Sequence, residues 1–166
     1  MGYKMAFSEE VKIKISSELY EVEASAFTDV DEDEVFDEEE IHEQSDMLEM
    51  NTFGTLCDDG DTVTLSYNET EASGMEGSNT IISFRKSSPE MVTMTRDGAV
   101  SATLVFEDGK RHHCLYKTPF MPFEVGVYTK NVVNSLLEDG TLNLDYIVEI
   151  RGAKAERTRF KMQIIR

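Results

Sequence analysis

The sequence predicts an all-β protein whose strands form a closed antiparallel barrel of about eight to ten strands, with one short helix. Short runs rich in β-branched and aromatic residues follow one another along most of the chain, and turn-forming residues separate them. Several connections are short, which favours antiparallel hairpins. A barrel is favoured over a sandwich because closure removes the edge strands that invite aggregation. The expected strands cover residues 10–18, 47–57, 62–70, 79–86, 90–96, 99–106, 111–118, 123–129, 141–150 and 157–165.

The breaks between these strands carry residues that favour turns. Asp-Gly pairs end at Gly60, Gly98, Gly109 and Gly140, where glycine is expected to supply a positive φ. The short helix is expected at 130–138, because its apolar residues share one side at helical spacing and a glycine follows its end.

Length and composition are those of one soluble domain. A chain of 166 residues can bury one substantial core, so residues 1–166 are expected to form a single domain. No apolar run is long enough to span a membrane, and the start of the chain lacks the apolar stretch of a secretory signal. Cys57 and Cys114 are too few for a disulfide framework. They are expected to be free thiols in a cytoplasmic protein of bacterial type, with a single bridge as the alternative.

One segment carries most of the net charge of −17. Residues 29–49 contain twelve Asp or Glu and no Lys or Arg, while the rest of the chain has 21 acids and 16 bases, a balance of −5. This charge repels phosphates, so nucleic acid is not expected as a partner. The segment itself is expected to be a mobile acidic loop, because dense like charge opposes compaction.

The stretch DVDEDEVFDEEE at 29–40 matches in part the loop that binds calcium in EF-hands. Acidic residues occupy ligand positions 1, 3, 5, 9 and 12 of the template, but Glu34 stands where the sharp turn requires glycine. The preceding sequence alternates like a strand, as at Val11 and Ile13, rather than like an entering helix. A formed calcium site is therefore not expected, and loose binding of divalent cations is the alternative.

Alternation along the strands separates inward from outward side chains. In TVTLSYNE, the apolar stripe that includes Tyr67 is continued by Glu69. In EMVTMTR, the stripe that includes Met94 is continued by Arg96. Glu69 and Arg96 are expected to lie within ion-pair distance or to line one cavity at the rim of the barrel. The alternative is that each emerges into solvent where its strand ends. Further inward-facing residues are expected to be Phe123, Val125, Val127, Leu142, Leu144, Tyr146, Val148, Ile150, Phe160, Met162 and Ile164.

The sequence contains no complete motif of an enzyme or a metal site. His112 and Cys114 can face the same way on a strand as zinc ligands or a catalytic dyad, but zinc needs three or four ligands, and no CxxC or HExxH motif is present. Glu69 and Glu71 have the spacing to serve acid–base chemistry or merely to decorate the rim. No nucleophile elbow and no phosphate loop occur. No catalytic residue, metal or cofactor is therefore assigned.

Four short motifs follow one another from residue 67 onward. They are a Tyr-x-Glu-x-x-x-x-Gly-Met segment, an Arg-x-Gly turn, a Tyr-x-Thr-Pro segment and a late Leu-x-Tyr strand. The residues concerned are Tyr67, Glu69, Gly74, Met75, Arg96, Gly98, Tyr116, Thr118, Pro119, Leu144 and Tyr146. In this order, over residues 47–166 and the first strand, the chain resembles the YwiB-like family of bacterial proteins of unknown function. The resemblance implies a lipocalin-like, calycin-type barrel in a cytoplasmic protein, and it implies no activity.

The chain also departs from that family's pattern in two places. Phe120 is followed by Met121 and Pro122, where the family usually has an aromatic residue and then glycine. The acidic insert is longer than the family pattern leads us to expect, which makes it a poor place to seek a shared function.

The function that these observations favour is the binding of a small apolar or amphipathic molecule inside the barrel, without catalysis. The residues expected at the interior or mouth are Tyr67, Glu69, Arg96, Tyr116, Thr118 and Tyr146. The alternative is a structural or protein-interaction domain whose barrel is filled by side chains, acting through its surface or its acidic loop. The chain is expected to be a monomer or a homodimer, with neither nucleic acid nor a membrane as partner.

Overall fold

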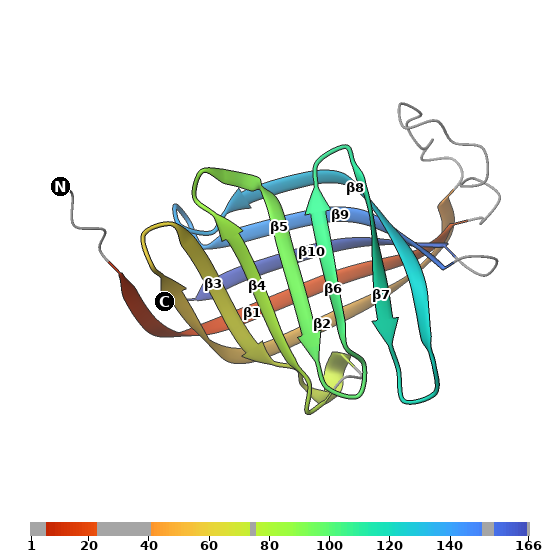
Figure 1. The fold of residues 1–166 in the computed structure, drawn as a ribbon, viewed down its shortest axis with the longest axis horizontal. Coiled ribbons are helices and arrows are strands. Elements are labelled where there is room, and N and C mark those ends of the chain that lie inside the picture. Colours follow the sequence, from red (N-terminus) through yellow and green to blue (C-terminus); the bar gives the residue numbers. More distant parts are fainter. Residues whose placement is uncertain (1–5, 23–40, 74–75, 151–154, 166) are drawn as a thin grey trace.

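The computed structural model describes residues 6–22, 41–73, 76–150 and 155–165. They form one antiparallel sheet of ten strands in the order β6-β5-β4-β3-β2-β1-β10-β9-β8-β7 (Figure 1). The strands are β1 (Phe7–Val22), β2 (Ile41–Asp58), β3 (Thr62–Asn68), β4 (Asn79–Arg85), β5 (Ser88–Asp97), β6 (Ala102–Glu107), β7 (Arg111–Lys117), β8 (Pro122–Ser135), β9 (Thr141–Ile150) and β10 (Ala155–Ile165). The described residues contain a single helical element, the 3-10 turn η3 (Glu71–Ser73), and no helix long and apolar enough to cross a membrane.

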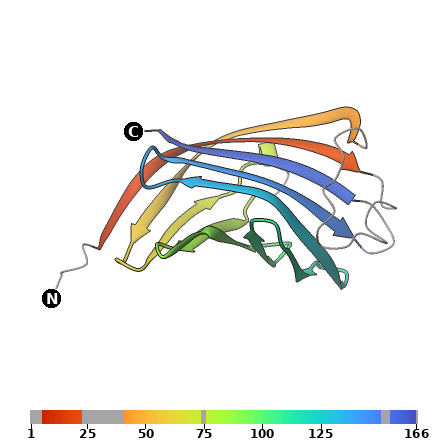
Figure 2. The same cartoon turned by 90° about the horizontal axis from the view of Figure 1, so that it is seen from above.

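The sheet curls until its two end strands, β6 and β7, approach each other and nearly close a barrel (Figure 1, Figure 2). At one end of this seam, Ser101 and Lys117 exchange two backbone hydrogen bonds of 2.9 Å. At the other end, the chain turns directly from β6 into β7, and Lys110 N–H donates to the Glu107 carbonyl at 3.0 Å. Backbone hydrogen bonds therefore hold the seam at both ends, and the predicted antiparallel barrel of about ten strands is confirmed.

The two longest strands flank the acidic segment. β1 has 16 residues and β2 has 18, and they pair from Phe7 with Asp58 to Val22 with Ile41. Residues 41–49 form the first part of β2. The strand predicted at 47–57 is present, but residues 41–46 were predicted to belong to the acidic loop, so this boundary of the predicted loop is wrong. Pairing with β1 satisfies their backbone groups, which outweighs the sparser charge of this part of the segment. The rest of the segment, with the stretch that partly matches a calcium loop, lies outside the described residues.

The helix predicted at 130–138 is absent, and that prediction is wrong. β8 continues to Ser135, with a register shift after Thr129 that preserves its pairing with β9. Val132 and Val133 are β-branched, which lowers their helix propensity and suits a strand. The ladder with β9 therefore outweighs the helical spacing of the apolar residues.

Three of the four predicted glycine turns have the expected backbone. Gly60, Gly109 and Gly140 have φ of 98°, 75° and 81°. Gly98 is not among the glycines of positive φ, so the reason predicted for it is wrong. A Cβ at Gly98 would lie 2.8 Å from Cβ of Ser78, and this close approach of two loops is what requires glycine there.

The barrel is packed solid at the end where β1 begins and β10 finishes. Alternate residues of the strands point inward, as the period of two predicts. Large side chains fill this end, and none of them is more than 6% exposed. They are Val11, Ile13, Leu56, Val63, Leu65, Ile82, Phe84, Val92, Met94, Phe106, Leu136, Leu142, Met162 and Ile164.

Candidate functional site

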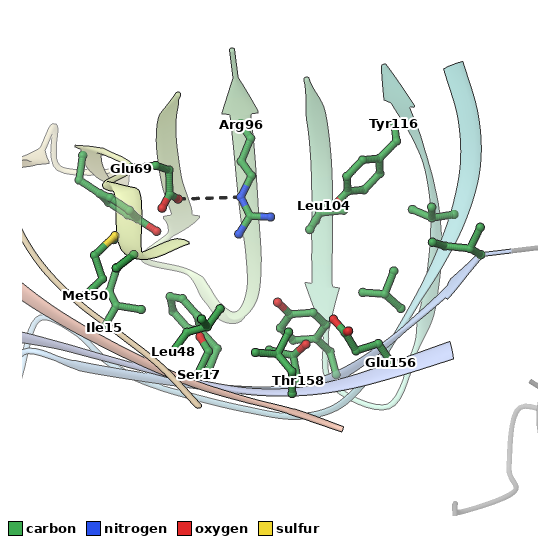
Figure 3. A pocket seen from close by; sticks show the side chains of 18 of the residues that line it. Ile15, Ser17, Leu48, Met50, Glu69, Arg96, Leu104, Tyr116, Glu156 and Thr158 are labelled. Carbon is green, nitrogen blue, oxygen red and sulfur yellow. Dashed lines mark ion pairs between the residues drawn. The ribbon is translucent and has the colours of Figure 1, made fainter. Parts of the chain in front are cut away.

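The opposite end of the barrel contains a cavity of about 410 Å³. It forms where β3, β5, β7 and β9 finish and where β2, β6, β8 and β10 begin (Figure 3). Most of its wall is apolar, with Ile15, Leu48, Met50, Leu104, Val125, Val148 and Phe160 among the lining residues. The polar residues of the wall are Ser17, Tyr67, Glu69, Arg96, Tyr116, Tyr146, Glu156 and Thr158. One end of the barrel is thus filled and the other is hollow.

Two tyrosines and several apolar residues form the deep part of the cavity, and exposed apolar residues share its rim with Glu156. Tyr67, Tyr146 and Leu104 are only 4%, 5% and 2% exposed, so they lie at the bottom. Leu48 and Ile150 are 38% and 37% exposed, so they lie at the opening.

Glu69 and Arg96 face each other inside the cavity, as predicted (Figure 3). Oε1 of Glu69 lies 4.0 Å from Nε of Arg96, and the two side chains are 3% and 17% exposed. Glu69 follows β3, where its N–H donates to the Ser78 carbonyl at 2.8 Å. Thr80 on β4 donates its hydroxyl to Oε1 of Glu69 at 2.6 Å. The prediction that Glu69 and Arg96 lie within ion-pair distance or line one cavity is therefore confirmed.

Three tyrosines line the cavity together with Arg96. Burial alone lowers the pKa of Arg96, but the oxygens of Tyr146, Tyr116 and Tyr67, together with Glu69, outweigh burial and raise it. Burial raises the pKa of all three phenols, those of Tyr67, Tyr116 and Tyr146. At neutral pH the cavity therefore holds one cation, which stays charged, and three uncharged hydroxyls that can donate or accept hydrogen bonds.

The structure brings together Tyr67, Glu69, Arg96, Tyr116 and Tyr146 as lining residues of the cavity. It does not bring Thr118 there. The Thr118 hydroxyl donates to the Met121 carbonyl at 2.8 Å and accepts from the N–H groups of Phe120 and Met121, at 3.3 and 3.2 Å. Thr118 therefore shapes the turn between β7 and β8, because β7 already finishes at Lys117.

Four polar residues of the site were not predicted from the sequence. Ser17, Glu156 and Thr158 line the cavity, and Thr80 holds Glu69. The same period of two could have found them, since Thr158 is in phase with Phe160 on β10 and Ser17 is in phase with Ile15 on β1.

The other groups considered as catalytic or metal-binding residues do not form a site in the described residues. Nε2 of His112 lies 3.0 Å from Oε1 of Glu107, and the Cys114 side chain packs against the core. Desolvation raises the pKa of the Cys114 thiol to about 11, which opposes a role as a nucleophile. Glu71 is exposed in η3 whereas Glu69 is buried, so their predicted common face does not exist. In the part of the chain that the structure describes, no three His, Cys, Asp or Glu residues form a group that could hold a metal ion.

Fold and cavity define the class of this protein: a nearly closed antiparallel β-barrel that is packed at one end and hollow at the other. The chain belongs to the family of the domain of unknown function DUF1934, whose family model matches residues 35–162. The crystal structure of ywiB protein from Bacillus subtilis is similar to it, with a TM-score of 0.61 over 95% of this chain and 94% of that chain. At 18% sequence identity, that likeness shows a shared fold alone. The resemblance to the YwiB-like family is confirmed, and a comparison with curated proteins gives no match.

Proposed function

We propose that this protein binds a small amphipathic molecule in the hollow end of its barrel and carries out no chemistry on it. The observation that carries the proposal is the cavity of about 410 Å³, whose apolar wall surrounds a buried Glu69–Arg96 pair. Binding pockets for small molecules have volumes of about 300–1,000 Å³ and combine an apolar wall with a few convergent polar groups.

The energetic reason is that a ligand would bury apolar surface at the rim and pair a buried polar atom at the bottom. Leu48 and Ile150 stay in contact with solvent at the rim, and a ligand chain would remove their apolar surface from water. At the bottom, Arg96 Nε is buried without a hydrogen-bond partner. A polar ligand group would supply the missing acceptor and relieve that cost.

The setting that we propose is the cytoplasm, because both described cysteines, Cys57 and Cys114, are free thiols. Neither nucleic acid nor a membrane is part of the proposal.

Native mass spectrometry of protein purified without detergent tests the proposal directly. We expect a reproducible non-covalent adduct that disappears on denaturation, or an adduct that forms on incubation with an extract of small molecules. Val148→Phe adds bulk to the cavity wall and should abolish the adduct. Leu115→Phe adds similar bulk on the exposed outer face of β7 and should leave it unchanged. An adduct that both variants retain would overturn the assignment to this cavity.

The second candidate function, a protein-interaction domain, has one observation of its own. Phe120 and Met121 are 95% and 65% exposed at the tip of the β7–β8 turn, where the Thr118 hydroxyl fixes the backbone. Exposed apolar residues at a fixed turn suit contact with another protein. Phe120→Ser should weaken such a contact, and it should leave an adduct in the cavity unchanged.

A further inference from the structure

We infer that the polar end of the ligand is an uncharged group that both donates and accepts hydrogen bonds, such as a hydroxyl or a primary amide, and that it lies between Glu69 and Arg96. This inference rests on the proposed function and narrows it to one ligand chemistry. The chain of the ligand then extends toward the apolar rim.

The charges of the cavity disfavour a charged ligand. Its buried bottom holds one acid, Glu69, and one base, Arg96, so the two formal charges cancel. An anionic ligand would leave a net negative charge in a space that is largely shielded from water, and burial of an uncompensated charge is costly. A cationic ligand would face the same cost beside Arg96. Glu156 at the rim adds a further acid on the path of an entering anion (Figure 3).

The separation of Glu69 and Arg96 leaves room for a bridging polar group. At 4.0 Å, Glu69 Oε1 and Arg96 Nε are too far apart for a direct N–H···O hydrogen bond. The pair is therefore neutral in sum but keeps unused hydrogen-bonding capacity on both sides. Arg96 Nε has no hydrogen-bond partner, and Glu69 Oε1 accepts a hydrogen bond from the Thr80 hydroxyl. A carboxylate can accept several hydrogen bonds. A group that accepts from Arg96 and donates to Glu69 fits this arrangement without adding charge.

The positions of the polar and apolar lining residues set the orientation of the ligand. Tyr67 and Tyr146 place uncharged hydroxyls at the bottom of the cavity beside Arg96. Leu48 and Ile150 place apolar surface at the rim. A ligand with one polar end and one apolar end matches both regions only if the polar end enters first.

Three probes of equal chain length test the inference: octanamide, octanoate and octylammonium. Octanamide and octanoate have nearly the same shape and differ in charge and in the donor that the amide carries. Titration calorimetry near neutral pH should show octanamide binding at least about tenfold more tightly than either charged probe.

Two variants then change the charge of the site in opposite directions. Glu69→Gln can still accept from Thr80 but leaves Arg96 without its counter-charge, so octanoate should become the preferred probe by about tenfold. Arg96→Met leaves Glu69 alone and should turn the preference toward octylammonium. The matched control is Glu71→Gln, which removes the same charge from the exposed η3 turn and should leave the order of the three probes unchanged.

The outcomes separate this inference from the proposed function. Tighter binding of octanoate than of octanamide by the unmodified protein, or no change of preference in Glu69→Gln and Arg96→Met, overturns the inference and leaves an amphipathic ligand standing. Failure of all three probes to bind, together with a clean native mass without adduct, overturns both.

Discussion

Glu69 and Arg96 meet across a strand to which neither belongs. Glu69 follows β3, Arg96 lies near the end of β5, and β4 runs between them. Thr80 of β4 is paired with Tyr67 on one side and with Arg96 on the other. Its hydroxyl, which faces the barrel interior, donates to Glu69 at 2.6 Å and fixes that carboxylate beside the guanidinium. A buried threonine is therefore the positioning residue of the pair.

Thr80→Val should destabilise the protein by about 1–3 kcal/mol, because it keeps the shape of the side chain and leaves the buried Glu69 carboxylate without its donor. Urea unfolding followed by circular dichroism measures the change in the free energy of unfolding. The control is Thr95→Val on the neighbouring strand, where the side chain is half-buried on the outer face and a change within about 0.5 kcal/mol is expected. Equal effects of the two substitutions would show that the Thr80 hydroxyl does not hold Glu69.

The ion pair could be predicted from the sequence, because the prediction needs only the alternation of residues along each single strand. A period of two assigns each residue of a strand to one face without knowledge of the neighbouring strands. Tyr67 and Glu69, or Met94 and Arg96, can therefore be assigned to the interior by counting. The helix at 130–138 could not be assigned correctly in this way, since its apolar residues fit both periods and the pairing partner of β8 decided between them.

The hollow end of the barrel could not be predicted, because it depends on relations between strands. Inward-facing side chains fill or leave a space according to the stagger and tilt of all the strands around the barrel. Leu104 and Tyr146 are as large as the residues of the packed end, yet they border a cavity. Thr118 was assigned to the interior because the sequence does not show that β7 stops one residue before it.

Gly54 permits close contact within the packed end, and Gly54→Ala should destabilise the protein by more than about 2 kcal/mol. A Cβ at this position would lie 2.5 Å from the backbone oxygen of Ser66 and 2.6 Å from Cδ1 of Ile13. The backbone of β3 cannot move away without breaking its ladder. Thermal and urea unfolding measure the loss.

The matched control for Gly54 is Gly126→Ala in β8. The nearest atom to a Cβ there is Oε2 of Glu149 at 3.7 Å, an ordinary contact with a flexible side chain. This substitution should change the free energy of unfolding by no more than about 1 kcal/mol. The expected change is an increase in stability, because alanine reduces the conformational entropy of the unfolded chain. A loss as large as that of Gly54→Ala would contradict the steric explanation.

Asp58 should make the stability of the protein depend on acid pH. Oδ2 of Asp58 lies 2.5 Å from Nζ of Lys86, and Oδ1 accepts from the Gly60 N–H at 2.8 Å. The hydrogen bond from Lys86 lowers the pKa of Asp58, against the effect of burial. Because the pKa is lower in the folded state, the stabilisation is present above the ordinary carboxyl pKa of about 3.9 and is lost as pH falls through the folded value.

Asp58→Asn tests this dependence. The variant should be less stable than the unmodified protein near neutral pH, and the difference should shrink as the pH falls below about 4. Urea unfolding at several pH values gives the comparison. Asp46→Asn removes an exposed carboxylate from β2 and serves as the control. A difference between Asp58→Asn and the unmodified protein that stays constant down to acid pH would rule out the proposed role of the Lys86 pair.

Cys114 should react slowly with alkylating reagents in the folded protein. Desolvation raises the pKa of this half-buried thiol to about 11, whereas an unfolded chain has a cysteine pKa of about 8.5. Because the thiolate is the reactive form, folding should slow alkylation near neutral pH by on the order of a hundredfold. The same shift of the pKa affects stability. Because the fold favours the neutral thiol, the contribution of Cys114 to the free energy of unfolding is complete below the unfolded pKa and is lost as pH rises through the folded value.

A Cys57→Ser variant isolates the alkylation of Cys114. Mass spectrometry can follow its reaction with iodoacetamide in buffer and in urea. The Cys114→Ser variant gives the reference rate for Cys57. Alkylation of Cys114 at the same rate in buffer as in urea would mean that the thiol is not buried against the core.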